Sequence, residues 1–414
     1  MTVGLLLALL ISQDADPAPA ADTEHETPSE NKEPPRGAIA VEVTWRDGFG
    51  FRSPSGDLQL LIGGRVHNDW MVSSADGALS QRARDLNDGD DFGSGTRFRR
   101  ARINLQGQLY RRVGFRSEFE FAQGNQVEST DTYLEIEQLP IIGDLRIGNY
   151  KEPFSFAFLE SSNIITFQEF SLAHAFSPDR NSGIGFSNTI GDRFHYATGV
   201  FIETAGFRET RIRGEVVSTS RVAAILFENK AERVLAQVGV SFRYERLGRN
   251  TQRYSVVSGS TLAPVVFDTG DLAGKETYAL DGQLAFVAGP FDLVAEGTGV
   301  RAVLAGDRTP TYWGYFVSVG WFFTGESRPF NPSTMLFARV RPNKNLFDGG
   351  PGAFQLAARW SELDLNGGGR GNEVTGVLNW WANPHARISL AYVTTSLYGF
   401  GRMHMGQTRI AFDF

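Results

Sequence analysis

The sequence predicts an all-β fold, a transmembrane antiparallel β-barrel of about sixteen strands. The end of the chain gives the first indication: Ile410, Phe412 and Phe414 are apolar. Arg409 and Asp413 take alternate positions and are charged. Because successive side chains of a strand point to opposite faces, this segment has one apolar face and one charged face. Such a strand fits a wall between lipid and water.

The same alternation recurs along the chain and gives the second indication. In 100–109 every even position is polar and every odd position is apolar or small. In 313–321 every odd position is apolar, with Trp313, Tyr315 and Trp321 near the two ends. Aromatic residues at both ends fit the two girdles of a membrane barrel. The rows run about ten residues, longer than typical strands of soluble sandwiches.

Sixteen candidate strands follow from this pattern. They are 58–69, 97–110, 113–123, 130–138, 143–150, 182–190, 193–203, 217–228, 232–246, 275–287, 291–303, 310–323, 352–364, 372–381, 385–396 and 404–414. An even number of strands brings both chain termini to one side of the membrane. We expect this side to be periplasmic and to carry the short turns. The long links 70–96, 151–181 and 247–274 then lie outside. The link 324–351 is long but falls on the short-turn side, which leaves room for a further hairpin there.

The N-terminal residues differ from the rest in composition. The apolar run Val3–Ile11 is too short to span a membrane as a helix and fits a signal peptide over residues 1–21. It lacks a basic leading segment, and a short buried strand is the alternative. Residues 22–40 are acidic and proline-rich and are expected to be disordered. The barrel then takes residues 41–414. The segment between Gln13 and Gly37 contains seven acidic and two basic residues, so most of the net charge of −7 lies outside the barrel.

Composition and motifs argue against several classes of function. The chain has no cysteine, which excludes disulfides and thiolate metal sites. Its six histidines show no metal-binding spacing, and neither a G-x-S-x-G elbow nor a P-loop is present. The acidic pairs Glu118/Glu120 and Glu135/Glu137 fit one face of a strand better than a hydrolase dyad. We therefore expect no enzyme, no metal, no cofactor and no nucleic-acid partner.

Several segments resemble the phosphate-selective porin O and P family. They are Leu60–Val66, Phe98–Arg102, Gly148–Phe154 with Glu160–Ser162 and Ile165–Phe167 after it, Trp321–Phe330 and Leu356–Ser361. The terminal Phe414 also resembles the end that bacterial outer-membrane barrels present to their insertion machinery. The resemblance runs from about residue 45 to the end. It implies a sixteen-stranded, trimeric channel in the bacterial outer membrane for phosphate-like anions, in contact with outer-membrane lipid.

The candidate anion site consists of basic and hydroxyl side chains on the polar rows. It comprises Arg65, Arg99, Arg100, Arg102, Arg116, Arg146, Lys151, Ser161, Ser162 and Arg180. Of the 40 basic residues only five are lysines, and arginine binds phosphate in a bidentate manner. A GC-rich genome would also favour arginine. Arg99 lies on the opposite face by strict alternation, so a bulge or the strand end must turn it inward if the resemblance of the paired-arginine strand holds. Alternatively, these arginines pair with the acidic residues and only hold the wall together.

The segment 151–181 is the expected constriction. It is too long for a turn and carries large apolar residues such as Phe154, Phe158 and Phe167. An exposed loop would not carry so many, so we expect it to fold back into the barrel. Lys151, Ser161 and Ser162 match central-site positions only through the family resemblance, and ordinary loop hydrogen bonding is the alternative for the serines.

Passive, selective diffusion of phosphate or similar anions is the function that this pattern favours. Acidic residues on the inward rows argue against it unless they form ion pairs. A general or weakly selective porin, or a non-conducting structural or adhesive barrel, is the alternative.

Overall fold

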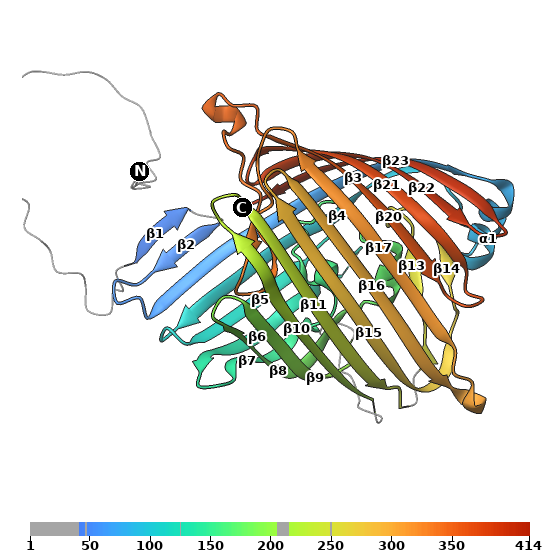
Figure 1. The fold of residues 1–414 in the computed structure, drawn as a ribbon, viewed down its shortest axis with the longest axis horizontal. Helices are drawn as coiled ribbons and strands as arrows, with labels where there is room; N and C mark the ends of the chain where they lie inside the picture. Colours follow the sequence, from blue (N-terminus) through green and yellow to red (C-terminus); the bar gives the residue numbers. More distant parts are fainter. Residues whose placement is uncertain (1–40, 46–47, 125, 205–214, 249–250) are drawn as a thin grey trace, which may run out of the picture. The chain divides into compact units, whose positions relative to one another are not determined.

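A closed barrel of sixteen antiparallel strands forms the wall in the computed structural model, which describes residues 41–45, 48–124, 126–204, 215–248 and 251–414 (Figure 1). The wall strands are β3 (Leu58–Ala75), β4 (Ser94–Leu109), β5 (Val113–Glu120), β6 (Glu128–Leu139), β7 (Gly143–Lys151), β8 (Arg180–Ile190), β9 (Phe194–Ile202), β10 (Val216–Asn229), β11 (Val234–Arg246), β15 (Leu272–Ala288), β16 (Phe291–Leu304), β17 (Thr311–Phe322), β20 (Ala353–Asp364), β21 (Arg370–Asn383), β22 (Ala386–Leu397) and β23 (Gly401–Asp413). Each overlaps one predicted range, so the predicted fold is confirmed. The predicted signal peptide and acidic segment lie outside the described residues.

Neighbouring strands pair in chain order, and β23 closes the barrel by pairing with Arg65–Ala75 of β3. Alternation sorts the side chains between lipid and lumen: Val317 and Val319 are exposed on the outer face, whereas the alternating residues Phe316 and Ser318 are buried. Aromatic rings stack at opposite ends of β17, Trp313 on Tyr315 at one end and Trp321 on Phe291 at the other. In the described part of the chain, no helix has the length and apolarity needed to cross a membrane.

A short hairpin precedes the barrel and was not predicted as separate strands. It consists of β1 (Glu42–Trp45) and β2 (Phe49–Arg52), and β2 pairs with the first part of β3. At this point Gly64 and Phe414 exchange backbone hydrogen bonds of 2.9 and 3.0 Å. A side chain at Gly64 would lie 2.7 Å from the Phe414 ring, so only glycine lets the terminal ring lie across the strand.

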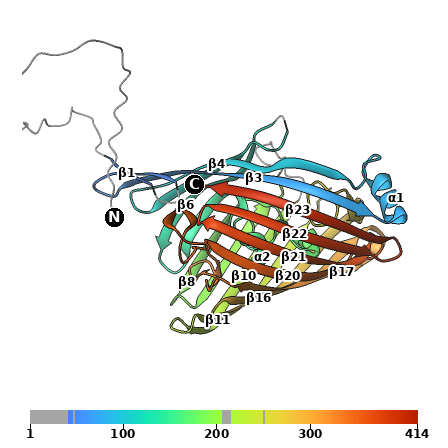
Figure 2. The ribbon, with the colours of Figure 1, turned by 90° about the horizontal axis from the view of Figure 1, so that it is seen from above.

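The link between β7 and β8 (residues 152–179, the lumen loop) enters the barrel, as predicted. It contains α2 (Phe156–Leu159) and a 3-10 helix, η1 (Leu172–Phe176). Figure 2 shows α2 within the ring of strands. Phe154 and Phe156 are fully buried, because they pack against inward-facing wall residues instead of meeting water.

The link between β17 and β20 (residues 323–352, the inner hairpin) also turns inward, from the end of the barrel where the chain terminates. Its strands β18 (Phe330–Asn331) and β19 (Leu336–Phe337) pair only with each other, so they add a hairpin without adding wall strands. A 3-10 helix, η3 (Leu346–Asp348), follows. Phe337 packs edge-on against Phe156 of the lumen loop, with ring centroids 5.3 Å apart.

The opposite end of the barrel carries the remaining short elements. They are α1 (Gly77–Leu86), β12 (Thr251–Gln252), β13 (Ser255–Val257), β14 (Val265–Asp268) and a 3-10 helix, η2 (Ala305–Asp307). Leu79 of α1 and Phe267 of β14 belong to one buried apolar cluster. β13 and β14 form a hairpin. Nε of Arg82 donates to the carbonyl oxygen of Val266 at 2.8 Å, which fixes α1 to this β13–β14 hairpin. This cluster packs against Leu172 and Phe176 of the lumen loop, so the loop is supported from this end as well.

Candidate functional site

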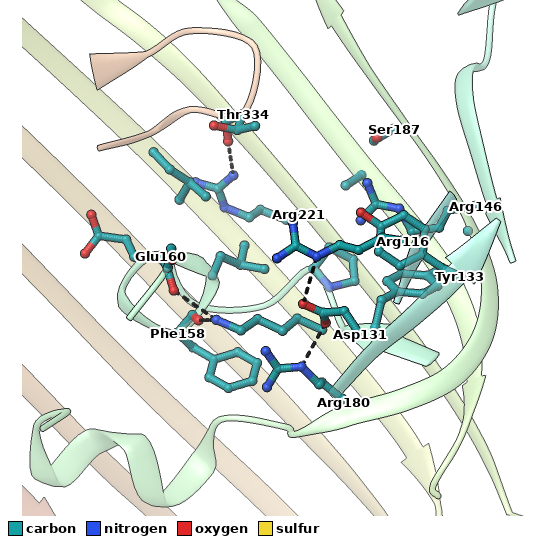
Figure 3. Close-up of a pocket in the computed structure, with 18 of the residues that line it drawn as sticks. Arg116, Asp131, Tyr133, Arg146, Phe158, Glu160, Arg180, Ser187, Arg221 and Thr334 are labelled. Atoms are coloured by element: carbon teal, nitrogen blue, oxygen red, sulfur yellow. Dashed lines mark hydrogen bonds and ion pairs between the residues drawn. The ribbon is translucent and has the colours of Figure 1, made fainter. Parts of the chain in front are cut away.

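A cavity of about 440 Å³ lies in the lumen between the wall strands β3–β10, the lumen loop and the inner hairpin (Figure 3). It gathers nine of the ten predicted site residues, which are Arg65, Arg100, Arg102, Arg116, Arg146, Lys151, Ser161, Ser162 and Arg180. Eight basic and four acidic residues line it, so basic side chains are in excess. Within the described residues, no cluster of His, Cys, Asp or Glu could hold a metal ion.

Arg99 is the exception, and its position follows from a β-bulge. His67 of β3 pairs with Arg100, but the next residue, Asn68, pairs with Phe98, so Arg99 is the extra residue in β4. The bulge lets Arg99 turn inward, although strict alternation would place it on the outer face. Its Nε and Nη2 donate to the Glu169 carboxylate at 2.8 and 3.1 Å. Arg99 therefore anchors the lumen loop and does not line the cavity.

Glu118 of β5 is the acidic centre of the cavity wall. Its carboxylate accepts hydrogen bonds from Arg65 at 2.6 Å, Arg102 at 2.8 Å and Arg116 at 3.2 Å. The hydroxyl of Thr130 donates to it at 2.7 Å. Three guanidinium groups thus share one carboxylate that is only 1% exposed, and the group as a whole stays positive.

The other acidic residues that would repel an anion also have hydrogen-bond partners. Glu120 accepts from Nε of Arg102 at 2.6 Å, and Glu135 accepts from Nη2 of Arg146 at 2.8 Å. Glu137 accepts from Nε2 of Gln108 at 2.6 Å. The carboxylates of Glu120 and Glu135 are thus neutralised locally, which is the arrangement that an anion path requires, whereas the partner of Glu137 is a neutral amide.

Asp131 joins two further cations at the cavity wall. Nε of Arg180 donates to its carboxylate at 2.8 Å, and Nε of Arg116 lies 3.8 Å away (Figure 3). Arg65 in turn donates to the hydroxyl oxygens of Ser162 at 2.9 Å and Ser161 at 3.4 Å. The two serines therefore hold an arginine in place, which is the loop hydrogen bonding given above as the alternative.

Arg100 and Lys151 differ from the other predicted cations, because neither forms an ion pair with any described residue. Arg221 of β10, which was not predicted, also lines the cavity without an ion pair and binds Gln283 and main-chain oxygens of the inner hairpin. Arg100 is 4% exposed, and its Nε and Nη1 have no hydrogen-bond partner in the described part of the protein. Nζ of Lys151 donates to the main-chain oxygens of Phe158 and Glu160, the second at 2.9 Å. Backbone carbonyls thus fix the ammonium but leave its charge without a counter-ion, and an ammonium has three donors.

A second set of inward arginines was missed by the sequence reasoning. They bind main-chain oxygens of the lumen loop: Arg328 that of Ile164, Arg387 that of Ile165, Arg409 that of Gln168, and Arg359 those of Glu169 and Phe170. Nδ2 of Asn379 donates to Thr166 O at 3.0 Å. Alternation places Arg359, Arg387 and Arg409 on inward rows, so the sequence pattern could have identified these three residues. Successive carbonyl groups are held, and the loop is fixed across the lumen.

The start of α2 is fixed by Glu296 of β16. Its carboxylate accepts from the backbone N–H groups of Phe156 at 2.8 Å and Ala157 at 3.0 Å. The Ser155 hydroxyl donates to it at 2.5 Å. A carboxylate at a helix N-terminus satisfies N–H groups that have no partner within the helix. The turn that presents Leu159–Ser162 to the cavity is therefore set from the opposite wall.

Glu160 gives the site a pH dependence. Its side chain is 7% exposed, and burial raises its pKa to about 7, although Arg328 lies 3.9 Å away and opposes this shift. The carboxyl is mostly neutral at pH 6 and mostly charged at pH 8. A negative charge next to Lys151 opposes anions, so the anion-over-cation permeability should fall from pH 6 to pH 8. Reversal potentials in a potassium chloride gradient measure this ratio. In E160Q the ratio should fall less over this range, and a pH response in E160Q as large as that of the unmodified protein would contradict the assignment.

Comparisons with known proteins agree with the fold. Residues 62–396 match the family model of phosphate-selective porin O and P. An uncharacterized protein of Caulobacter vibrioides is 27% identical over 394 residues, or 91% of this chain and 76% of that protein.

Three solved structures resemble the barrel, and at their low identities the likeness shows the fold alone. An anion-selective porin from Comamonas acidovorans has a TM-score of 0.53 and 14% identity, over 86% of this chain and 100% of that one. The outer membrane channel DcaP of Acinetobacter baumannii has a TM-score of 0.52 and 11% identity, over 88% and 99%. The trimer form of OmpT, an outer membrane protein of Vibrio cholerae, has a TM-score of 0.51 and 9% identity, over 86% and 99%.

Proposed function

Since the chain belongs to the phosphate-selective porin O and P family and is an outer-membrane porin, we propose that it conducts phosphate or similar small anions by passive, selective diffusion. The path runs through the cavity beside the lumen loop, and the end of the barrel where the chain terminates faces the periplasm. The channel needs no chemistry of its own, so selectivity depends on which charges meet the ion on the way.

The observation that carries the proposal is the pair of cations without counter-ions, Arg100 and Lys151. A guanidinium offers two N–H groups in one plane, which matches two oxygens of a phosphate, and an ammonium adds a point charge. Arg100 is buried in the cavity wall without an ion pair, so its positive charge can act on an anion in the cavity. A positive charge without a counter-ion in a partly buried site attracts an anion and repels a cation, so an anion passing the site is favoured.

The cations that form ion pairs supply weaker binding sites along the same path. Conduction requires binding that is strong enough for an ion to approach and weak enough for it to leave. Arg102, Arg116 and Arg180 are partly neutralised by Glu118 and Asp131, which gives weaker sites next to the strong one. A graded series of this kind supports transfer from one site to the next.

Planar-bilayer recordings of the purified protein test this function. In a potassium chloride gradient the reversal potential should have the sign of anion selectivity, and added inorganic phosphate should reduce the chloride current. A cation-selective sign would reject the anion path and favour a general porin. Absence of conductance steps from correctly folded protein would favour a structural or adhesive barrel.

A homotrimer is the second part of this proposal. The trimer form of OmpT gives one precedent for the fold. On the outward rows of β5 and β6, hydroxyls replace apolar residues: Thr132 lies 2.7 Å from Ser129 and 3.3 Å from Ser117. Small hydroxyl residues on an outward row let a neighbouring subunit approach closely. The mass of the particle in mild detergent tests this, and a monomer would exclude the trimer.

A further inference from the structure

Partly exposed apolar side chains line the cavity beside its cations. They are Tyr133 from β6, Leu159 and Phe170 from the lumen loop, and Leu336 from the inner hairpin. These residues come from three separate segments, and none of them completes its burial against the protein. Apolar surface that faces water is unfavourable, and a small hydrated ion gains nothing from it. An apolar group on the passing solute would cover this surface.

The cavity is also larger than a bare ion needs. Its volume of about 440 Å³ lies in the range of pockets that hold organic ligands. Inorganic phosphate, one phosphorus atom with its oxygens, would fill only a small part of it.

Glycines in the wall keep this space open. A side chain at Gly185 would lie 2.7 Å from the Tyr150 hydroxyl, and one at Gly199 would lie 2.8 Å from the Phe201 ring. Both rings can therefore lie close against the backbone of β8 and β9 and leave the lumen clear. The guanidinium of Arg146 lies over the Tyr133 ring, 4.2 Å from its centroid, so a flat, charged group already rests on this part of the wall (Figure 3).

The apolar surface and the unpaired charge are direct neighbours. Lys151 donates to the main-chain oxygens of Phe158 and Glu160, the two residues on either side of Leu159. Its ammonium also lies over the Phe158 ring, 4.7 Å from the centroid. One small molecule can therefore reach the ammonium with its charge and Leu159 with its body.

We infer that the constriction is built for an organic oxyanion, a phosphate or carboxylate group carried on an apolar body about the size of one aromatic ring. The oxyanion binds at Arg100 and Lys151, and the body covers Leu159, Tyr133 and Leu336. This inference rests on the proposed anion path and names its substrate class.

Block of the chloride current in planar bilayers tests the inference with the unmodified protein. Phenyl phosphate should block at a concentration roughly threefold to tenfold lower than inorganic phosphate, the effect of one added aromatic contact. Benzoate against acetate repeats the comparison for carboxylates. A preference in only one pair identifies the head group, and equal block within both pairs overturns the inference.

Variants locate the apolar contact. L159S and L336S should each reduce the preference for phenyl phosphate and leave block by inorganic phosphate within about twofold, because they change no charge. The matched control is L346S, an exposed leucine of η3 outside the cavity. A preference that survives in both cavity variants overturns the placement. The two proposals fail separately: equal block within both pairs rejects only the organic substrate, whereas a cation-selective channel rejects the anion path itself.

Discussion

Neutralising the two unpaired cations, in the double variant R100Q/K151Q, should weaken phosphate block of the chloride current by roughly two orders of magnitude. The physical reason is that Arg100 and Lys151 offer charged donors that no described carboxylate occupies. A hydrogen bond to a charged group contributes about 1.5–3 kcal/mol, so losing two such contacts costs at least about 3 kcal/mol, which corresponds to about two orders of magnitude. The concentration of phosphate that halves the single-channel chloride current measures it.

The matched control for this prediction is R308Q/K344Q. Arg308 and Lys344 are exposed on links between strands and lie outside the cavity, so the change in net charge is the same. The control should keep the block of the unmodified protein. If R100Q/K151Q forms a folded barrel and phosphate blocks it as before, these two residues are not the anion site.

Arg100 and Arg102 show how far the sequence carries the prediction of the site. Alternation places both on one inward row of β4, and it does so from local spacing alone. Their neighbours differ, because the pairing of β4 with β5 begins at Arg102, opposite Glu120. Arg102 therefore meets the carboxylates of β5, whereas Arg100 lies beyond its end. Which cation stays free depends on where a neighbouring strand stops, and strand ends were predicted only approximately.

The inner hairpin is the part of the fold that the sequence pattern could not predict. All sixteen wall strands follow from alternation, since each strand must be apolar toward lipid wherever it lies in the barrel. The segment 323–352 could be recognised only as a link of unusual length. Its inward course depends on Met335 and Phe337, which are buried against Phe156 and the inner wall. Contacts between residues this far apart in the chain leave no periodic pattern.

Removing Arg409 should open the channel, because this residue ties the lumen loop to the wall. Its side chain is fully buried, with Nε and Nη2 both 2.6 Å from the Asp69 carboxylate and Nη2 also 2.8 Å from Glu169. It further donates to the main-chain oxygen of Gln168. In R409Q the buried Asp69 carboxylate would lose its arginine partner, and Glu169 would keep only Arg99. Breaking a buried ion pair in this way costs about 3–5 kcal/mol, which is enough to release a locally held segment.

The expected result for R409Q is a severalfold larger single-channel conductance with weaker phosphate block. R387Q is the matched control: Arg387 donates to Ile165 O at 2.6 Å, and its loss should have a smaller effect because it forms no ion pair with a described carboxylate. The triple variant D69N/E169Q/R409Q removes the stranded charges together with the cation. If charge repulsion opens the loop, its conductance should return toward that of the unmodified protein. Unchanged conductance in R409Q would mean that the other carbonyl contacts hold the loop without Arg409.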